Sequence, residues 1–413
     1  MGVQWIVQSN AFWRRSLPLL MQKIVTGIDV GSYHVKVVIA AAPENPRDAP
    51  KILGTGYAES RGMKQGYIIS IPEVSRSIAA AVAQASKAAQ VKVKRAYVGV
   101  GGVGLDEAFS RGETVVERGD SELTARDIPR VLAAAEQALA PAALLNRRIL
   151  HTIPLRYAVD GVRVMGRSPV GLKGVRLSSE TLFITCLERH VSDIVTAVEE
   201  AGIEVEDIAA APLAASFVAL SKTQKRVGCV LANIGSETLS IIVFEDGIPV
   251  SVRVFPVGAS DITNDIALGL RIPPEEAEQL KQGAVLGSPY PQRKVGDIIS
   301  RRVSDMFKLV EAQLKKIGKN ELLPAGIILT GGGGAVQNIS DLAKAVLKLP
   351  SRVASLSEGV GSKVHLKDGS WAVAYGLTIW GFTQGEDPDN NQAHAGVKDA
   401  LKLLSRWFKK FLP

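Results

Sequence analysis

Apolar and polar positions along the chain predict an alternation of strands and helices. Continuous apolar runs typical of buried strands occupy residues 24–30 and 33–40, and apolar residues at helical spacing follow at residues 72–89. The helical spacing recurs at residues 191–201 and 300–317. This alternation predicts α/β lobes. A chain of 413 residues is too long for one compact core and suits two lobes of ordinary domain size.

A strand pair joined by a Gly-Ser turn occurs twice in the chain. The first turn is Gly31-Ser32 and the second is Gly235-Ser236, and glycine supplies the positive φ that tight hairpins need. A spacing of 204 residues separates Gly31 from Gly235 and also Asp29 from Asn233. Two similar hairpins at half-chain spacing suggest a duplicated lobe. Coincidence is the alternative, because Gly-Ser hairpins are common.

Other segments of the chain have a different composition and pattern of residues. Residues 96–181 combine glycine-rich strands with an alanine-rich helix, which predicts an inserted small α+β subdomain. Residues 383–396 are polar and lack apolar periodicity, as flexible linkers do. The predicted organisation comprises an extension of uncertain start and no assigned role (1–20), a first lobe (21–95 and 182–220) around the insertion (96–181), a second lobe (221–382), the linker (383–396) and a terminal helix (397–413).

The terminal segment, residues 397–413, is the cleanest amphipathic helix in the chain. Its apolar face includes Leu401, Leu404, Trp407, Phe408 and Phe411, and its basic face includes Lys402, Arg406, Lys409 and Lys410. Such a helix lies in the surface of an anionic membrane with its lysines reaching the headgroups. The alternative is an ordinary helix packed on the body of the protein.

The net charge of +8 is concentrated at one end of the chain. Five basic residues and one acidic residue give residues 396–413 a charge of +4, so the charge does not indicate a nucleic-acid-binding domain. Cys186 and Cys229 lie in apolar runs, which predicts buried thiols in a reducing cytosol. No apolar run reaches the roughly 18 residues that span a bilayer. Arg14 and Arg15 follow the apolar part of the N-terminal segment, which is the wrong order for a signal peptide.

A glycine-rich loop adds a third feature to the two hairpin turns. Residues 326–330 form a short apolar run that leads into four consecutive glycines, with a helix expected from about Ala335. Glycines let the backbone approach a ligand closely, and amides at a helix start favour anions. The glycines are Gly331, Gly332, Gly333 and Gly334.

These loops resemble those of the actin-like ATPases. Gly27-Ile-Asp29-Val-Gly31-Ser32 resembles their first phosphate loop, residues 231–238 the second, and residues 329–335 the adenosine loop. The resemblance implies the two-lobe fold of actin, heat-shock chaperones and sugar kinases, with ATP and Mg²⁺ as cofactors. The implied phosphate-binding residues are Asp29, Gly31, Ser32, Lys36, Asn233, Gly235, Ser236 and Thr238, with Asp29 also holding the metal through water.

Glu278 and Lys281 resemble the pair that contacts ribose and adenine in heat-shock chaperones, alongside the four glycines. Their ordinary interpretation is an i,i+3 ion pair on a helix surface. Lys36 likewise has the alternative of a solvated strand lysine.

Within this superfamily the chain resembles the FtsA family. The segments that carry the resemblance are residues 60–66, 150–160 and 169–176. The resemblance implies an adaptor at the cytoplasmic face of the inner membrane that anchors FtsZ filaments at the division site, assembles into actin-like filaments and contacts other division proteins. It implies an FtsZ peptide site with Arg302 and Asp305, and no nucleic acid partner. PilM, the actin-like protein of type IV pilus machines, is the first alternative, although such a tail is not expected there.

The sequence departs from the pattern of an ATPase at two carboxylates. Asn233 replaces the aspartate usual in the second phosphate loop, and Ala211 occupies the place of a glutamate that orients water in chaperones. A neutral amide cannot supply that negative charge. We therefore expect nucleotide binding with weak or absent hydrolysis and assign no catalytic residue. The alternative is that Glu237, which replaces a glycine near the phosphates, takes over.

Overall fold

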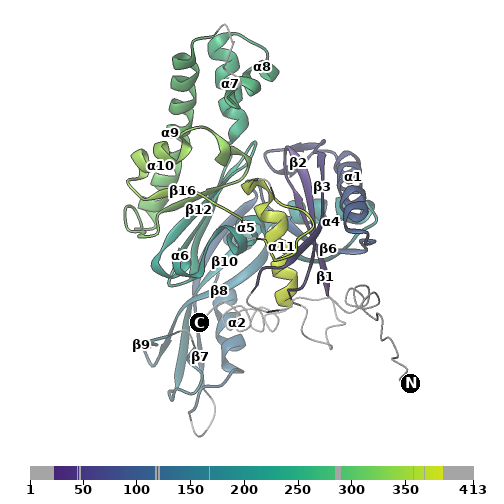
Figure 1. The fold of residues 1–413 in the computed structure, drawn as a ribbon. Coiled ribbons are helices and arrows are strands. Elements are labelled where there is room, and N and C mark those ends of the chain that lie inside the picture. Colours follow the sequence, from purple (N-terminus) through teal and green to yellow (C-terminus); the bar gives the residue numbers. More distant parts are fainter. Residues whose placement is uncertain are drawn as a thin grey trace, which may run out of the picture.

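The computed structural model describes residues 23–384 except residues 44, 46–47, 117–118, 120, 167, 284–289, 357 and 367. Two lobes, each built on a five-stranded sheet, lie side by side, and a third body projects below them (Figure 1). The predicted linker beyond Gln384, the terminal helix and the N-terminal extension lie outside the described residues. Within the described part, no helix is both long enough and apolar enough to cross a membrane.

The sheet of the first lobe has the strand order β11-β6-β1-β2-β3. β1, β2 and β3 are antiparallel neighbours, whereas β6 and β11 run parallel to β1. The helix α1 packs so closely on β3 that a Cβ at Gly56 would come within 2.0 Å of the α1 backbone. The elements are β1 (Ile24–Val30), β2 (His34–Ala41), β3 (Lys51–Glu59), α1 (Ile71–Ala89), β6 (Arg95–Val100), α4 (Glu188–Glu200), β11 (Glu204–Ala210) and α5 (Ala211–Ala219).

The sheet of the second lobe repeats this arrangement in the order β14-β13-β12-β15-β16. Asn233 pairs with Ser240 as Asp29 pairs with Lys36, so the spacing of 204 residues reflects a duplicated hairpin. The helices α7, α8 and α9 extend upward from this sheet (Figure 1). The elements are α6 (Lys222–Val227), β12 (Cys229–Ile234), β13 (Leu239–Glu245), β14 (Ile248–Phe255), α7 (Ala259–Leu270), α8 (Pro274–Lys281), α9 (Gln292–Lys316), β15 (Ile327–Thr330), α10 (Ile339–Leu347) and β16 (Ser351–Val353).

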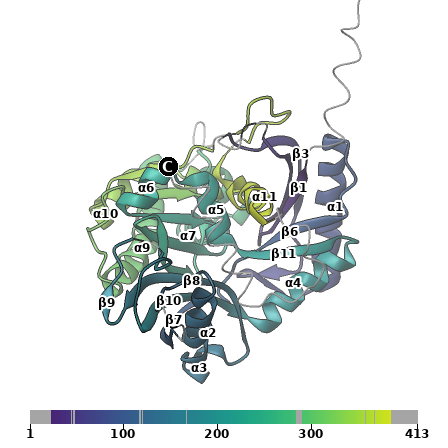
Figure 2. The ribbon, with the colours of Figure 1, turned by 90° about the horizontal axis from the view of Figure 1, so that it is seen from below.

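The third body is the inserted subdomain, a sheet of order β7-β10-β8-β9. Figure 2 shows α2 lying over this sheet, where a Cβ at Gly112 would come within 2.3 Å of Val131 O. Its strands span residues 105–187, whereas the sequence pattern predicted 96–181, because β6 pairs with β1 in the first lobe. The elements are β7 (Leu105–Val115), α2 (Asp127–Gln137), α3 (Pro141–Leu144), β8 (Arg147–Val159), β9 (Val162–Arg163) and β10 (Arg176–Leu187).

Three further elements differ from the sequence pattern. The glycine run forms a short 3-10 turn, Gly332–Ala335, so the helix expected from Ala335 begins at Ile339 instead. The helix expected over 300–317 is α9, which begins earlier, at Gln292. The last helix, α11 (Ala372–Gln384), falls in the range predicted for the second lobe, yet it packs on β1, β2, β6 and α5 of the first.

Both cysteines are free and buried, as predicted. Burial raises the pKa of each thiol to about 12, so neither ionises near neutral pH.

Candidate functional site

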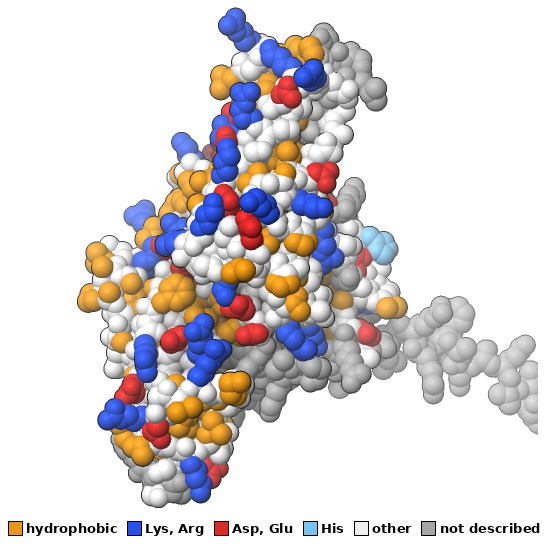
Figure 3. Space-filling model, turned by 90° about the vertical axis from the view of Figure 1, so that its left-hand side faces the viewer, with side chains coloured by type: hydrophobic (Ala, Val, Ile, Leu, Met, Phe, Trp, Pro, Cys, Tyr) orange, Lys and Arg blue, Asp and Glu red, His pale blue; other side chains and the backbone are white. Residues whose placement is uncertain are grey.

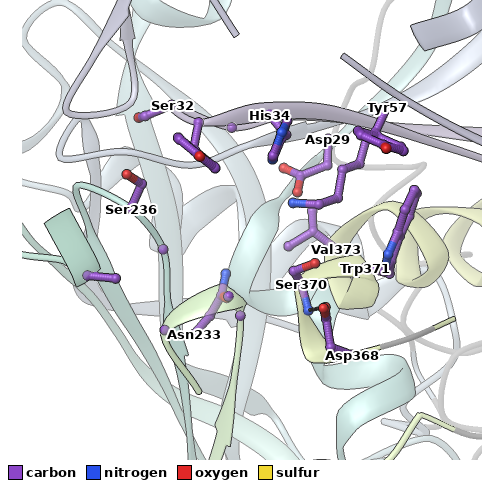
Figure 4. A pocket seen from close by; sticks show the side chains of 18 of the residues that line it. Asp29, Ser32, His34, Tyr57, Asn233, Ser236, Asp368, Ser370, Trp371 and Val373 are labelled. Atoms are coloured by element: carbon purple, nitrogen blue, oxygen red, sulfur yellow. Dashed lines mark hydrogen bonds between the residues drawn. The ribbon is translucent and has the colours of Figure 1, made fainter. Parts of the chain in front are cut away.

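A cavity of about 1000 Å³ lies between the two lobes, where the hairpin turns and the glycine loop meet. Figure 4 shows Asp29, Ser32 and His34 on the first-lobe side and Asn233 and Ser236 on the second-lobe side. Segments about 200 residues apart in the chain therefore face one another. The residues predicted from the sequence that line it are Asp29, Gly31, Ser32, Lys36, Asn233, Gly235, Ser236, Thr238, Glu278, Lys281, Gly331, Gly332 and Gly333; Gly334 is buried beside it.

The first-lobe wall carries opposite charges on adjacent strands. Asp29 on β1 pairs in register with Lys36 on β2, and both side chains line the cavity. Burial raises the pKa of the Asp29 carboxyl to about 6, and the Lys36 ammonium opposes the rise. Ser32 follows in the turn, where its Oγ accepts a hydrogen bond of 3.0 Å from the Gly66 amide.

The second-lobe wall is uncharged at the equivalent position. Asn233 lies against the glycine loop, where a Cβ at Gly331 would come within 2.5 Å of Asn233 Oδ1. Gly331 also has a φ of +84°, so glycine is required there for both reasons. In the turn, Ser236 Oγ shares a hydrogen bond of 2.6 Å with Ser260 Oγ at the start of α7.

The upper end of the cavity carries Glu278 and Lys281 on α8. They form the i,i+3 ion pair of the ordinary interpretation, with 2.6 Å between Glu278 Oε2 and Lys281 Nζ, and they also line the cavity. Thr263 of α7 holds both: its hydroxyl donates to Glu278 Oε2 (2.6 Å) and accepts from Lys281 Nζ (2.8 Å). Burial alone would raise the pKa of Glu278, but hydrogen bonds from Lys281, Thr263 and Gln282 lower it below its ordinary value.

Sequence reasoning missed Thr263 and an aromatic wall. His34 contacts Tyr57 edge-on at 5.6 Å between ring centroids, and Tyr57 contacts Trp371 at 6.4 Å. All three rings line the cavity, as Asp29 and Lys36 do. Figure 4 shows them on the same side of the cavity as Asp29. No motif or periodic pattern in the sequence predicts that these rings meet. Trp371, for example, comes to the wall from the turn before α11, far along the chain from the other two.

Two carboxylates, Asp29 and Asp368, line the part of the cavity near the aromatic wall (Figure 4). Ala211 also lines the cavity, and the Glu237 carboxylate accepts a hydrogen bond from the Gln65 amide and does not line the cavity. The described residues contain no cluster of three or more His, Cys, Asp or Glu side chains that could hold a metal. Asp29 and Asp368 are too few carboxylates to enclose a metal, and they suit Mg²⁺ that keeps most of its water.

Arg302 and Asp305 lie on α9, away from this cavity. The Arg302 guanidinium makes two hydrogen bonds to Asp265 on α7, of 2.7 and 2.8 Å. Asp305 pairs with Lys308 on its own helix at 2.7 Å. Both predicted residues therefore have partners within the second lobe.

Comparisons with known proteins match most of the chain. A family profile described as Cell division protein FtsA matches residues 230–376, and one described as the SHS2 domain inserted in FtsA matches residues 108–185. Cell division protein FtsA of Pseudomonas aeruginosa is 30% identical over 387 residues, which cover 88% of this chain and 91% of that protein. The Bacillus subtilis protein of the same name is 34% identical over 354 residues, covering 81% of this chain and 79% of that one.

Solved structures share the fold at low identity. A type IV pilus PilM–PilN complex matches with a TM-score of 0.63 and 17% identity over 86% of this chain and 98% of that one. MreB5 of Spiroplasma citri, solved bound to AMPPNP, matches with a TM-score of 0.51 and 13% identity over 87% of this chain and 96% of that one. The fold is therefore actin-like, as the loops predicted.

Proposed function

Because this chain belongs to the FtsA family of cell division proteins, we propose that it is an ATP-binding adaptor that anchors FtsZ filaments to the inner membrane. The observation that carries the nucleotide part is the convergence of both hairpin turns and the glycine loop on one interlobe cavity. Vesicle recruitment tests the whole proposal. Purified protein with ATP should bring fluorescent FtsZ to anionic vesicles. FtsZ should stay in solution when the protein or the ATP is omitted.

The walls of the cavity suit a nucleoside triphosphate. Lys36 supplies positive charge, and the turns at Gly31 and Gly235 supply backbone amides for the phosphates. The Glu278–Lys281 pair and the glycine loop suit the ribose and the base. Asp29 is the residue that would hold Mg²⁺, which neutralises phosphate charge when bound.

We further propose that the bound nucleotide is hydrolysed slowly or not at all. Asn233 presents an amide where a carboxylate would orient metal and water, and Ala211 presents a methyl group. Glu237 does not replace them, because its carboxylate contacts Gln65 and does not line the cavity. Loss of a general base commonly lowers a rate by 10² to 10⁴.

The membrane part of the proposal rests on residues 397–413. The sequence places apolar side chains such as Trp407 and Phe408 on one helical face and five basic residues on the other. Each basic residue adds about 1 kcal/mol near an anionic surface, and apolar burial adds to this. A peripheral position on the cytoplasmic side of the inner membrane, at the division site, follows from such an anchor.

For the FtsZ peptide we propose the face formed by α7 and α9. Leu268 on α7 is 78% exposed, and Arg302 is one-third exposed despite its pairing with Asp265. Arg301 and Lys294 are exposed basic residues nearby on α9. An acidic and apolar peptide would complement this mixture.

Self-association and the absence of a nucleic acid partner complete the proposal. Head-to-tail contacts that do not close generate filaments, and many weakly bound tails on one filament give avidity. On the face that carries α9 and α10, Lys and Arg side chains predominate, and acidic side chains lie among them (Figure 3). The acidic side chains within this face would repel a phosphate backbone, and we propose no nucleic acid partner.

A further inference from the structure

A small hairpin lies between the phosphate loops and the inserted subdomain. It consists of β4 (Met63–Lys64) and β5 (Tyr67–Ile68), and its tip is formed by Gln65 and Gly66. Both tip residues adopt positive φ, +50° and +82°, so two successive backbone amides turn away from the hairpin's own pairing. The tip therefore offers donors to other parts of the molecule.

The two amides at the tip bind one phosphate loop each. The Gly66 amide donates to Ser32 Oγ in the first-lobe turn at 3.0 Å, and the Gln65 amide donates to Glu237 Oε2 in the second-lobe turn at 2.5 Å. Because Gln65 belongs to the first lobe and Glu237 to the second, the second bond crosses the cleft. A small hinge motion that opens the lobes would break it.

The other side of the hairpin contacts the root of the inserted subdomain. The Tyr67 ring packs edge-on against His190 of α4 at 5.0 Å, and His190 Nε2 makes a hydrogen bond of 2.9 Å with Gly101 O. Tyr67 also packs beside Gly104, whose carbonyl accepts 2.8 Å from Arg147 Nη2 at the start of β8. Gly66 itself packs on Gly102, where an added Cβ would come within 2.4 Å of Gly102 Cα.

We propose that this hairpin, residues 63–68, is a clasp that couples closure of the lobes to the root of the inserted subdomain, with Glu237 as its positioning residue. Phosphates bound between the turns of Ser32 and Ser236 would hold both loops in place, and hence both tip amides; this step rests on the proposed nucleotide function. With the cleft open, the Gln65 amide loses its acceptor and the hairpin is held only on the first-lobe side. The element thus has two discrete states that a ligand biases.

Hydrogen–deuterium exchange without nucleotide tests the clasp itself. Glu237→Ala should speed exchange of peptides covering residues 63–68 and 101–105 by about tenfold, because the interlobe bond protects them from opening. Glu237→Gln keeps an acceptor oxygen and should restore most of the protection. Glu200→Ala, at an exposed position at the end of α4, is the matched control. Equal exchange in Glu237→Ala and wild type would overturn the clasp.

Exchange with AMPPNP tests the coupling. Nucleotide should slow exchange at residues 147–153 in wild type. In Glu237→Ala and Tyr67→Leu it should still bind, measured by calorimetry, without slowing exchange there. Equal slowing in the variants would overturn the coupling. If wild type binds no nucleotide, the proposed function and the nucleotide-driven coupling both fail, while the nucleotide-free comparison still decides whether the clasp exists.

Discussion

The guanidinium of Arg302 on α9 donates two hydrogen bonds to the carboxylate of Asp265 on α7, of 2.7 and 2.8 Å. The two side chains are only about one-third exposed, and the ion pair raises the pKa of Arg302 further. The guanidinium is thereby oriented, but its charge is already partly neutralised. An acidic peptide that binds at Arg302 must therefore share it with Asp265.

This competition gives opposite effects for the two partners. Arg302→Glu should weaken binding of an FtsZ C-terminal peptide about tenfold, the loss of one charge-assisted pair. Asp265→Asn should strengthen it severalfold, because Arg302 no longer has an internal anion. Fluorescence anisotropy with a labelled peptide measures both, with Lys315→Glu at the far end of α9 as control. Unchanged affinity in Arg302→Glu would place the site elsewhere.

Asn233 is expected to limit hydrolysis. Asn233→Asp supplies the missing carboxylate and should raise ATP turnover at least tenfold over a wild type that is close to background. Nucleotide affinity should change little, because the loop backbone is unchanged. A phosphate-release assay measures this, and Asn338→Asp, outside the cavity, is the control. Turnover near one per second in wild type would contradict the proposed role of Asn233.

The raised pKa of Asp29 predicts a pH dependence of nucleotide binding. Its pKa is about 6, so the carboxyl gains a proton as pH falls through 6 and loses the charge that would attract Mg²⁺ in the proposed site. The Mg²⁺-dependent part of ATP affinity should therefore fall severalfold from pH 7.5 to 5.5. Asp29→Asn should abolish this dependence. Titration with a fluorescent ATP analogue, with and without Mg²⁺, measures the difference.

His34 is the control for this prediction, because it also lines the cavity and its pKa is lowered from 6.5 mainly by burial. His34→Gln should retain the pH dependence. A flat profile in that variant would assign the effect to the imidazole instead.

The terminal helix is expected to govern membrane binding. Deleting residues 396–413 should abolish co-sedimentation with anionic liposomes, and Trp407→Glu should nearly abolish it, because a charge then enters the apolar face. High salt should weaken binding without removing it, since apolar burial persists. Gln392→Glu in the predicted linker is a matched control. Full binding by the truncated protein would exclude the anchor.

A buried lysine between the lobes predicts how stability varies with pH. Lys225 Nζ lies 5.1 Å from the ring centroids of Phe217 and of Phe244, and burial lowers its pKa from 10.5 to about 7. Between these values the unfolded chain binds more protons, so the free energy of unfolding should rise with pH from 7 toward 10. Lys225→Met should flatten this rise.

The same substitution should stabilise the protein at pH 6 to 7 by on the order of 2 kcal/mol, because a charged group no longer has to be buried. Thermal unfolding across pH measures both effects, with exposed Lys222→Met as control. A rise with pH in Lys225→Met as large as in wild type would contradict the assignment.

Local periodicity was sufficient for much of the fold. Continuous apolar runs identified β1 and β12, and the spacing of 204 residues between Asp29 and Asn233 indicated the duplicated hairpin. Both could be predicted because strands and tight turns are determined by residues that are neighbours in the sequence. The boundary of the inserted subdomain was placed too early, because β6 contains Gly99, which resembles the glycine-rich texture that follows. Gly99 is instead the site where Val373 of α11 packs closely.

The parts of the site that the sequence did not predict are contacts between distant segments. Glu237 and Gln65 are 172 residues apart, and neither has a periodic pattern that would join them. In the sequence, Thr263 does not differ from other polar residues of a helix. It joins the site only because α8 packs against α7 and places Glu278 beside its hydroxyl. Such pairings depend on how whole helices and strands pack against one another, and the spacing of residues in the sequence does not reveal that packing.

The close packing of α11 against the first lobe has a mechanical consequence. Gly27 and Gly376 let this helix press against β1 and α5, where an added Cβ at either glycine would come within 2.2 Å of a facing backbone oxygen. The Nζ of Lys23, the residue before β1, also donates to Gly381 O at 2.8 Å. If the chain beyond Gln384 is fastened to a surface, tension enters the protein along α11 and is borne as shear by the first lobe. Because the proposed FtsZ peptide site lies on α7 and α9 of the second lobe, a load between FtsZ and the membrane would pass across the cleft, so tension would act on the opening and closing of the lobes.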